Sequence, residues 1–244
     1  MPAIPGYCTA VTWADWVRGP EVEPSIYAAD FSRLGAQLGA LLDAGARIFH
    51  FDVGDGHFIG EITIGPVVLA SIAGLVHGRG AKLDCHLMVA EPERQFESIK
   101  QAGGDSVTFH AEVAADPART IARARELGLG AGVAFNPETT VARAAEAAES
   151  ADLALCMSIH PGLSGQSFMP EALERIAELR RSVPGTVLVQ VDGGVHGDNA
   201  RAVRDAGADL LVAGSAIFWQ DDPAAAYRGL AGAIAADWVS TRGR

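Results

Sequence analysis

Short apolar runs and longer amphipathic stretches alternate along the chain from Val22 onward. The short runs are rich in β-branched residues and are typical of buried strands, whereas the alanine-, leucine- and charge-rich stretches are typical of helices. We expect strands to begin near Val22, Ala46, Lys82, Ser106, Ala131, Leu153, Val187 and Asp209. We expect helices over residues 32–44, 65–77, 92–102, 116–127, 138–148, 170–182, 198–206 and 223–236.

Glycine follows several of the expected helices, as at Gly45, Gly103 and Gly207, where a left-handed cap would end the helix. Eight strand–helix units in series imply parallel strands joined by helical crossovers. Such units close most economically into an α/β fold of the (β/α)8 TIM-barrel type, which typically takes about 250 residues, and the chain has 244. A doubly wound open sheet is the alternative, but no Gly-x-Gly-x-x-Gly turn follows the first strand.

One catalytic barrel domain is expected over residues 22–244, because no linker-like change of composition interrupts that stretch. Residues 1–21 are expected to be an N-terminal extension, since their aromatic residues Tyr7, Trp13 and Trp16 follow no clear period. Chain termini of this kind are commonly disordered unless something holds them. We therefore expect the extension to pack loosely or to be disordered.

Charge and cysteine content narrow the classes of partner and compartment. A formal net charge of −11 repels polyanions, so neither nucleic acid nor an anionic membrane is expected as a partner. Cys8, Cys85 and Cys156 are far apart in the chain, which favours a reducing compartment over a disulfide framework. No apolar run approaches the roughly 20 residues that span a bilayer, and the N-terminus lacks the pattern of a secretory signal. A soluble, cytoplasmic protein is expected.

Polar residues end almost every expected strand, while the strand bodies are apolar. In a barrel the carboxyl ends of all strands meet at one mouth, where active sites lie. His50 and Asp52 are one strand step apart, so they point to the same side at the end of the second strand. The other polar strand ends are Ser25, His86, His110, Glu112, Asn136, Ser158 and Asp192. This pattern favours a functional mouth over a set of unrelated structural contacts.

The second, third and seventh strands end in two histidines and two carboxylates, namely His50, Asp52, His86 and Asp192. Imidazole and carboxylate ligands suit one divalent transition-metal ion, such as Zn²⁺, Fe²⁺, Mn²⁺ or Co²⁺. His110 and Glu112 could also be ligands, although for His110 a hydrogen bond to a ligand is the preferred interpretation. No catalytic role is assigned to the remaining loop and surface histidines, which include His57, His77 and His196.

Two glycine-bearing turns predict an anion pocket beside this set. Gly193 and Gly194 follow the seventh strand, and Gly214 and Ser215 follow the eighth. Glycine lets the backbone approach a ligand, and the loops after these two strands are the usual phosphate site of such barrels. After the sixth strand, residues 160–168 combine small and polar residues without a helix-forming run, which suits a mobile lid over a substrate. Plain turns and a passive surface loop are the alternatives.

An ordered series of short segments between Pro24 and Phe218 resembles the ribulose-phosphate 3-epimerase family. The segments are His50-x-Asp52-Val53-x-Asp55-Gly56-His57-Phe58, His86-Leu87-Met88-Val89, Asn136-Pro137-x-Thr139, Met157-Ser158-x-x-Pro161-Gly162, Gly165-Gln166-x-Phe168 and Val191-Asp192-Gly193-Gly194-Val195. Each is short, but their occurrence in this order is highly specific.

The resemblance implies a barrel of the ribulose-phosphate-binding type that inverts C3 of a ketose phosphate, such as D-ribulose 5-phosphate to D-xylulose 5-phosphate in pentose phosphate metabolism. In that family the residues matching His50, Asp52, His86 and Asp192 bind one divalent metal ion, and the two aspartates act as acid and base on opposite faces of the substrate. The metal is suited to stabilising the negative charge of an ene-diolate. The resemblance also implies a homo-oligomer. It assigns substrate contacts to Ser25, Met88, Met157, Gly165, Gly193, Gly194, Gly214 and Ser215.

The chain departs from the family pattern near the mouth. Gly54 stands where the family usually has methionine, Tyr27 replaces leucine, Ser164 replaces a lid glycine, and Gly60-Glu61 replaces Pro-Asn. Without the methionine we expect a wider and wetter site that stabilises the ene-diolate less well. The hypothesis that follows is a bulkier or differently configured substrate, such as a hexulose or heptulose phosphate.

Two other functions are compatible with a phosphate-binding barrel. An aldolase or lyase would need a Schiff-base lysine or a different acid–base set, but Lys82 opens the third strand and Lys100 lies within an expected helix. A non-catalytic barrel that only binds a sugar phosphate would not need two opposed aspartates. Both alternatives are therefore disfavoured, although the missing methionine at Gly54 keeps the second under consideration.

Overall fold

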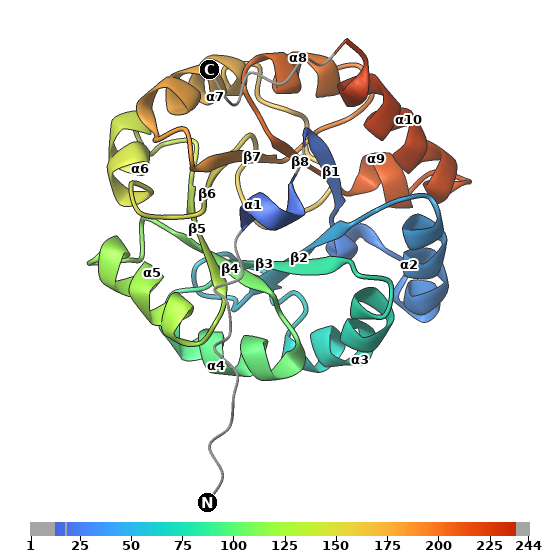
Figure 1. Cartoon of the computed structure of the whole chain (residues 1–244), viewed down its shortest axis with the longest axis horizontal. Coiled ribbons are helices and arrows are strands. Elements are labelled where there is room, and N and C mark those ends of the chain that lie inside the picture. Colours follow the sequence, from blue (N-terminus) through green and yellow to red (C-terminus); the bar gives the residue numbers. More distant parts are fainter. Residues whose placement is uncertain (1–12, 18, 238–244) are drawn as a thin grey trace, which may run out of the picture.

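Eight parallel strands form one sheet that curves into a barrel, and the helices surround it (Figure 1). The computed structural model describes residues 13–17 and 19–237. The strands are β1 (Glu21–Pro24), β2 (Ile48–Gly54), β3 (Lys82–Met88), β4 (Ser106–His110), β5 (Gly130–Phe135), β6 (Leu153–Met157), β7 (Leu188–Asp192) and β8 (Leu210–Ala213). They follow the order β1-β8-β7-β6-β5-β4-β3-β2. A parallel bridge between Ser25 and His50 joins the two edges, and the predicted (β/α)8 architecture is confirmed.

The helices expected from the sequence are all present on the outside of the sheet. They are α2 (Leu34–Asp43), α3 (Pro66–His77), α4 (Glu93–Ala102), α5 (Pro117–Glu126), α6 (Val141–Ala147), α7 (Ala172–Ser182), α8 (Ala200–Asp205) and α10 (Pro223–Ala235). Helix α6 begins at Val141 rather than at residue 138, because the Thr140 side chain accepts the Arg143 N–H and caps it there. A one-turn helix, α9 (Ser215–Phe218), is an addition to the expected elements. Among residues 13–17 and 19–237, no helix is both long enough and apolar enough to cross a membrane.

Left-handed glycines end helices where the sequence predicts them. Gly45, Gly103 and Gly207 have φ angles of 104°, 98° and 113°. A side chain would strain this backbone conformation, whereas glycine adopts it freely. These residues therefore turn the chain sharply from a helix toward the next strand.

Alternation along the strands separates two apolar regions. On β2, Phe49 and Phe51 belong to the outer core between the sheet and the helices, whereas Ile48 belongs to a smaller cluster inside the barrel. Leu188 and Leu210 join that inner cluster from β7 and β8. The two-residue period of a strand sends neighbouring side chains to opposite faces. The same period points His50 and Asp52 inward.

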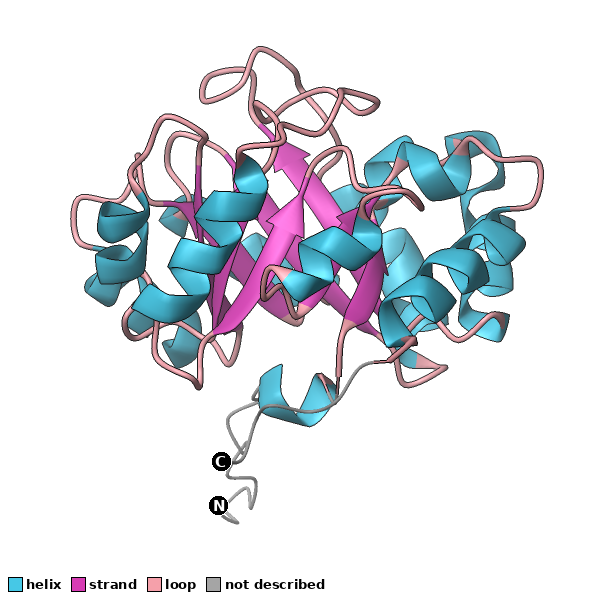
Figure 2. Cartoon of the chain, turned by 90° about the horizontal axis from the view of Figure 1, so that it is seen from above, coloured by secondary structure: helices cyan, strands magenta, loops and turns pink. Residues whose placement is uncertain are grey.

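A short helix, α1 (Trp13–Trp16), covers the amino-terminal ends of the strands. It lies across the barrel in Figure 1 and beneath it in Figure 2. Trp13 and Trp16 are 2% and 8% exposed and pack with Val17 against the inner cluster. A Cβ atom at Gly130 would lie 2.9 Å from Trp13 Nε1, so the indole fills the space of a missing side chain.

The expectation of loose packing or disorder is therefore wrong for Trp13, Trp16 and Val17. The barrel floor is apolar at Ile48, Leu188 and Leu210, and burying aromatic surface against it is favourable. Residues 1–12 and 18 lie outside the described part of the chain. The division into an extension and one catalytic domain stays a prediction.

Candidate active site

The carboxyl-terminal ends of the strands open into a mouth on the side opposite α1, where the longer loops gather (Figure 2). The two predicted catalytic aspartates and every predicted substrate-binding residue line one pocket there. These residues are Asp52, Asp192, Ser25, Met88, Met157, Gly165, Gly193, Gly194, Gly214 and Ser215. The structure thus brings together positions that the strand-end argument placed at one mouth.

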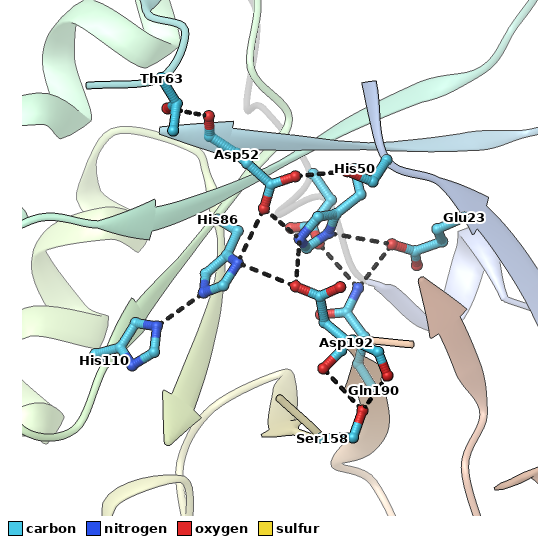
Figure 3. A network of polar contacts seen from close by, with 12 residues as sticks. Glu23, His50, Asp52, Thr63, His86, His110, Ser158, Gln190 and Asp192 are labelled. Atoms are coloured by element: carbon cyan, nitrogen blue, oxygen red, sulfur yellow. Dashed lines mark hydrogen bonds and ion pairs between the residues drawn. The ribbon is translucent and has the colours of Figure 1, made fainter. Parts of the chain in front are cut away.

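Two histidines and two aspartates converge from β2, β3 and β7 (Figure 3). Nε2 of His50 lies 3.3 Å from Asp52 Oδ1 and 3.9 Å from Asp192 Oδ2. Nδ1 of His86 lies 3.2 Å and 3.7 Å from the same two oxygens. One ligand atom from each of the four residues lies within 4.8 Å of the others. Nε2 of His50 is buried without a hydrogen bond to any described residue. This donor set fits a divalent transition-metal ion.

A buried polar layer lies beneath these four residues and contacts the other edge of His50. Nδ1 of His50 lies 3.2 Å from Asp84 Oδ2 and 3.7 Å from Glu23 Oε2. The Gln190 amide donates to Glu23 at 2.6 Å and to Asp84 at 3.0 Å. Ser106 Oγ donates to the second Asp84 oxygen at 2.7 Å. The His50 ring is therefore held on both sides by carboxylates.

Glu23, Asp84 and Gln190 are supporting residues that the sequence interpretation missed. Each stands two positions before a mouth residue, in the same order Ser25, His86 and Asp192. Side chains two apart on a strand share a face, so period-two alternation is the signal that could have found them. The other histidines set aside from the sequence, His57, His77 and His196, contact Asp55, Asp105 and Asp198 outside this site.

His110 and Glu112 continue the polar contacts outward from His86. Nε2 of His110 lies 2.9 Å from Nε2 of His86, and Nδ1 of His110 lies 3.4 Å from Glu112 Oε2. The other Glu112 oxygen accepts the Asn136 N–H at 2.9 Å and the Thr139 hydroxyl. Burial lowers the pKa of His110 to about 4. His110 thus contacts a candidate ligand, which is the role preferred for it from the sequence.

The two aspartates differ in their preference for a proton. Burial opposes ionisation of Asp52, but the charge of His50, 3.3 Å away, and the contact with His86 outweigh it and hold the pKa of Asp52 far below its usual range. Burial and the negative charge of Asp52 raise the pKa of Asp192. Burial lowers the pKa of His50, yet the carboxylates around it, Asp52 foremost, raise it well above the usual value.

Close packing leaves the pocket lined by backbone at the turns after β7 and β8. Gly193 and Gly194 have φ angles of 119° and 64°, and a Cβ atom at Gly194 would lie 2.4 Å from the Phe168 nitrogen. A Cβ atom at Gly214, just before α9, would lie 3.1 Å from Ala28 Cβ. A side chain therefore does not fit at Gly194 and would be tight at Gly214, and a ligand can approach the main chain closely.

The predicted lid is a loop at the pocket, and it has neither helix nor strand between residues 160 and 168. Leu163, Ser164 and Gly165 line the pocket. The Gln166 amide braces the loop by donating to the carbonyls of His160 and Leu163 at 2.8 and 3.0 Å. A Cβ atom at Gly165 would lie 2.8 Å from the Trp219 ring. The loop is placed as a lid would be, and its movement stays a prediction.

The space beside Gly54 is filled, so the expectation of a wider and wetter site is wrong. A Cβ atom at Gly54 would lie 2.6 Å from Ile59 Cδ1, and 3.0 Å from both the Glu61 carbonyl oxygen and Thr63 Cγ2. The Gly54 N–H donates to the Thr63 hydroxyl at 2.6 Å, and that hydroxyl donates to the Asp52 carbonyl at 2.7 Å. The loop after β2 folds back onto the strand end and occupies the place that a larger side chain would take.

The fold and the site together define a barrel enzyme with a candidate metal site at its mouth. The model of the ribulose-phosphate 3 epimerase family matches residues 21–218. A ribulose-phosphate 3-epimerase of Escherichia coli (strain K12) is 41% identical over 204 residues, which cover 82% of this chain and 90% of that protein. One from Synechocystis sp. is 42% identical over 214 residues, covering 86% and 92%. The 3-hexulose-6-phosphate synthase from Salmonella typhimurium has a TM-score of 0.67 at 17% identity, covering 88% of this chain and 98% of that one; this likeness shows the fold alone.

The chain belongs to the ribulose-phosphate 3 epimerase family, because the family model and the curated relatives cover most of it. It is an isomerase of the carbohydrate epimerase class. The resemblance drawn from the ordered motifs is confirmed.

Proposed function

We propose that this chain inverts C3 of D-ribulose 5-phosphate to give D-xylulose 5-phosphate, with Asp52 and Asp192 as the acid–base pair and one divalent metal ion at the mouth. The names of the relatives support the substrate. One observation supports the chemistry above all, which is that the carboxylates of Asp52 and Asp192 converge on one centre, 3.3 and 3.9 Å from Nε2 of His50, in surroundings that lower the pKa of Asp52 and raise that of Asp192. Environments that push the pKa values of two groups apart typically separate an acid from a base.

The metal would be held by His50, Asp52, His86 and Asp192. Their ligand atoms cluster within 4.8 Å, and the buried Nε2 of His50 has no hydrogen-bond partner among the described residues. Two imidazoles in the donor set favour Zn²⁺, Fe²⁺, Mn²⁺ or Co²⁺ over the oxygen-seeking Mg²⁺ and Ca²⁺. When bound, a divalent cation supplies Lewis-acid stabilisation of the negative charge that develops next to a carbonyl after proton removal.

Asp52 and Asp192 reach the pocket from different strands, β2 and β7. With a substrate carbon between them, one carboxylate takes the C3 proton and the other carboxyl group delivers a proton to the opposite face, which inverts the configuration. The Ser25 hydroxyl donates to Asp52 Oδ2 at 2.7 Å and orients it. The Ser158 hydroxyl donates to the carbonyls of Asp192 and Gly193 at 2.9 and 2.6 Å and holds the end of β7.

The rest of the pocket suits a phosphorylated sugar. Met88 and Met157 are buried beside the aspartates, where their apolar side chains exclude water and strengthen electrostatic interactions. The phosphate group would lie at the main chain of Gly194 and Gly214, next to Ser215. Gly165 of the lid loop would close over it.

Exchange of the C3 proton with solvent deuterium, followed by NMR, tests the proposal. With metal-loaded protein we expect exchange accompanied by inversion, and a chelator should abolish both. Asp52→Asn and Asp192→Asn are each expected to lower kcat by roughly 10²- to 10⁴-fold, the usual contribution of a general acid or base. Because Asp52 also belongs to the metal site, metal content is measured in each variant. Full activity in either variant would contradict the two-aspartate scheme. Full activity in the presence of a chelator would contradict the proposed requirement for a metal ion.

Hexulose and heptulose phosphates belong in the same assay, because Tyr27 and Ser164 line the pocket. We expect ribulose 5-phosphate to react fastest, since the loop after β2 fills the space beside Gly54. Faster exchange in a larger ketose phosphate would instead support the hypothesis that a hexulose or heptulose phosphate is the substrate. The homo-oligomer implied by the family resemblance stays a prediction, which sedimentation of the purified protein would check.

A further inference from the structure

His86, His110 and Glu112 form a line of polar contacts that leads away from the proposed metal position. Nδ1 of His86 faces Asp52 and Asp192, while its Nε2 lies 2.9 Å from Nε2 of His110 (Figure 3). Nδ1 of His110 lies 3.4 Å from Glu112 Oε2. The two rings are fully buried and stacked, with centroids 5.0 Å apart. Neither ring is therefore free to exchange these partners for water.

The proton positions along this line depend on one another. Two imidazole nitrogens 2.9 Å apart need one proton between them, because two lone pairs or two N–H groups would repel. An ionised carboxylate only accepts hydrogen bonds. Asp52 faces Nδ1 of His86 at 3.2 Å and Glu112 faces Nδ1 of His110 at 3.4 Å, so the two carboxylates compete for the N–H groups. A cation at Nδ1 of His86 would end this competition and leave the N–H of His110 directed at Glu112 from Nδ1. The facing atoms, His110 Nδ1 and Glu112 Oε2, have no hydrogen-bond partner among the described residues, so each is available to the other. Nε2 of His110 is then the acceptor, and His86 donates to it from its own Nε2.

We infer that Glu112 is a positioning residue that fixes the tautomer of His86 through His110. With its proton on Nε2, His86 turns the lone pair of Nδ1 toward Asp52 and Asp192. For the cation that this lone pair would bind, the inference rests on the proposed function. A carboxylate behind a histidine is a known means of orienting a metal ligand, and here it acts across a second histidine.

His50, the other proposed histidine ligand, needs no intermediate residue. Its Nδ1 lies 3.2 Å from Asp84 Oδ2, so a carboxylate directly accepts the proton on that side. Its Nε2 is left for the cation. Both histidines thus turn a lone pair toward the proposed cation. His50 does so through a direct contact with Asp84 of β3, and His86 does so through His110 of β4 and Glu112, a series of contacts that we call the relay.

Glutamine at position 112 would reverse the direction of the hydrogen bonds between residue 112, His110 and His86. Oε1 of Glu112 accepts both the Asn136 N–H and the Thr139 hydroxyl, so the amide oxygen of glutamine has to stay at that position. The NH₂ group would then replace Oε2 and donate to Nδ1 of His110. His110 would carry its proton on Nε2, and His86 would carry its proton on Nδ1, where it would oppose a cation.

Long-range ¹H–¹⁵N correlation spectra of the wild-type chain test the relay directly, because they show which ring nitrogen of each histidine carries a proton. They are recorded without added metal and with Zn²⁺, at about pH 8, above the ordinary histidine pKa of about 6.5. With Zn²⁺ bound we expect a proton on Nε2 of His86 and on Nδ1 of His110, whereas without metal Asp52 competes for a proton on Nδ1 of His86. A bare Nδ1 on His110 with Zn²⁺ bound would overturn the inference.

Glu112→Gln measures the consequence of reversing the relay. We expect the protons to move to Nε2 of His110 and Nδ1 of His86, and the Zn²⁺ affinity, measured by competition with a chelator, to fall by about 10- to 100-fold. Glu138→Gln is the matched control, because Glu138 contacts His160 at 2.6 Å on the surface; both readouts should stay unchanged. A folded Glu112→Gln variant with an unchanged His86 tautomer would contradict the relay.

The two readouts separate this inference from the proposed function. A wild-type chain that binds no divalent metal would contradict the proposed metal site and, with it, the inference that rests on that site. A wild-type chain that binds Zn²⁺ and epimerises with the opposite tautomers would keep the proposed function and remove the relay. Where the Glu112→Gln variant does not fold, the wild-type spectra decide alone.

Discussion

The two ends of the barrel are built from the same eight strands but bury opposite kinds of side chain. At the amino-terminal end, Trp13 and Trp16 of α1 lie on an apolar floor, and the Trp16 ring also faces the Lys82 ammonium at 5.2 Å. At the carboxyl-terminal end, ionisable side chains of His50 and Asp52 are buried together with those of β3 and β7. One end gains free energy from burial, whereas the other places charges where burial opposes them.

The two ends of the barrel therefore have different roles, because one contributes stability and the other contains the proposed catalytic residues. Helix α1 precedes the region matched by the family model, residues 21–218, whereas the mouth residues lie within it. In barrels of this kind the amino-terminal face serves stability and the carboxyl-terminal face serves catalysis. A change at the floor should therefore alter the free energy of unfolding and leave the kinetic constants alone.

Trp13→Ala gives the largest effect expected at the floor. Removing a buried aromatic side chain costs about 3–5 kcal/mol of unfolding free energy through lost burial and an unfilled cavity. Urea denaturation measures the loss, and kcat/KM should stay at the wild-type value in protein that is still folded. Trp13→Phe should lose less, because the Trp13 Nε1 it removes has no hydrogen-bond partner among the described residues. A fall in kcat/KM without a loss of stability would show that the two ends are coupled.

The mouth could be predicted from the sequence because two simple rules act there. Strand alternation put His50 and Asp52 on one face, and barrel closure brought His86 and Asp192 to the same mouth. The glycine turns around Gly194 were predictable for the same reason, since their position after a named strand fixes where they lie. At these positions the alternation of side chains along each strand and the closure of the barrel place the residues at the same mouth.

The floor could not be predicted in that way. Helix α1 has four residues, which is too short for a helical period to be recognised. Its burial depends on contacts with Leu188 and Leu210, far along the chain. The space at Gly54 was misjudged for a related reason, because a loop folding back through Ile59 fills it. Long-range contacts decided both cases.

Glu23 lies inside the barrel between the two ends, and its contribution to stability depends on pH. Burial raises the pKa of Glu23 from 4.5 to about 7. The folded state therefore favours the protonated form, and the stability from this group is present below pH 4.5 and is lost as the pH rises to about 7. At about 1.36 kcal/mol for each unit of pKa, the loss is on the order of 3 kcal/mol.

Glu23→Gln isolates this contribution from the other titrating groups. In the presence of a chelator, the unfolding free energy of the variant relative to wild type should rise by on the order of 3 kcal/mol between pH 4.5 and pH 7. It should change little below that range. Urea titrations at several pH values measure the difference. A difference that does not vary with pH would show that Glu23 has an ordinary pKa in the folded protein.

Gly54→Ala is the smallest change and tests the mouth by packing alone. Its Cβ would lie 2.6 Å from Ile59 Cδ1 and 3.0 Å from the Glu61 carbonyl oxygen, so we expect a loss of about 1–2 kcal/mol from overpacking. Ile59→Val removes Cδ1, and the double variant should therefore lose less than the sum of the two single variants. Urea denaturation of the wild type, the two single variants and the double variant completes this double-mutant cycle. A Gly54→Ala variant as stable as wild type would mean that the space is open after all, and the case for a larger ketose phosphate would return.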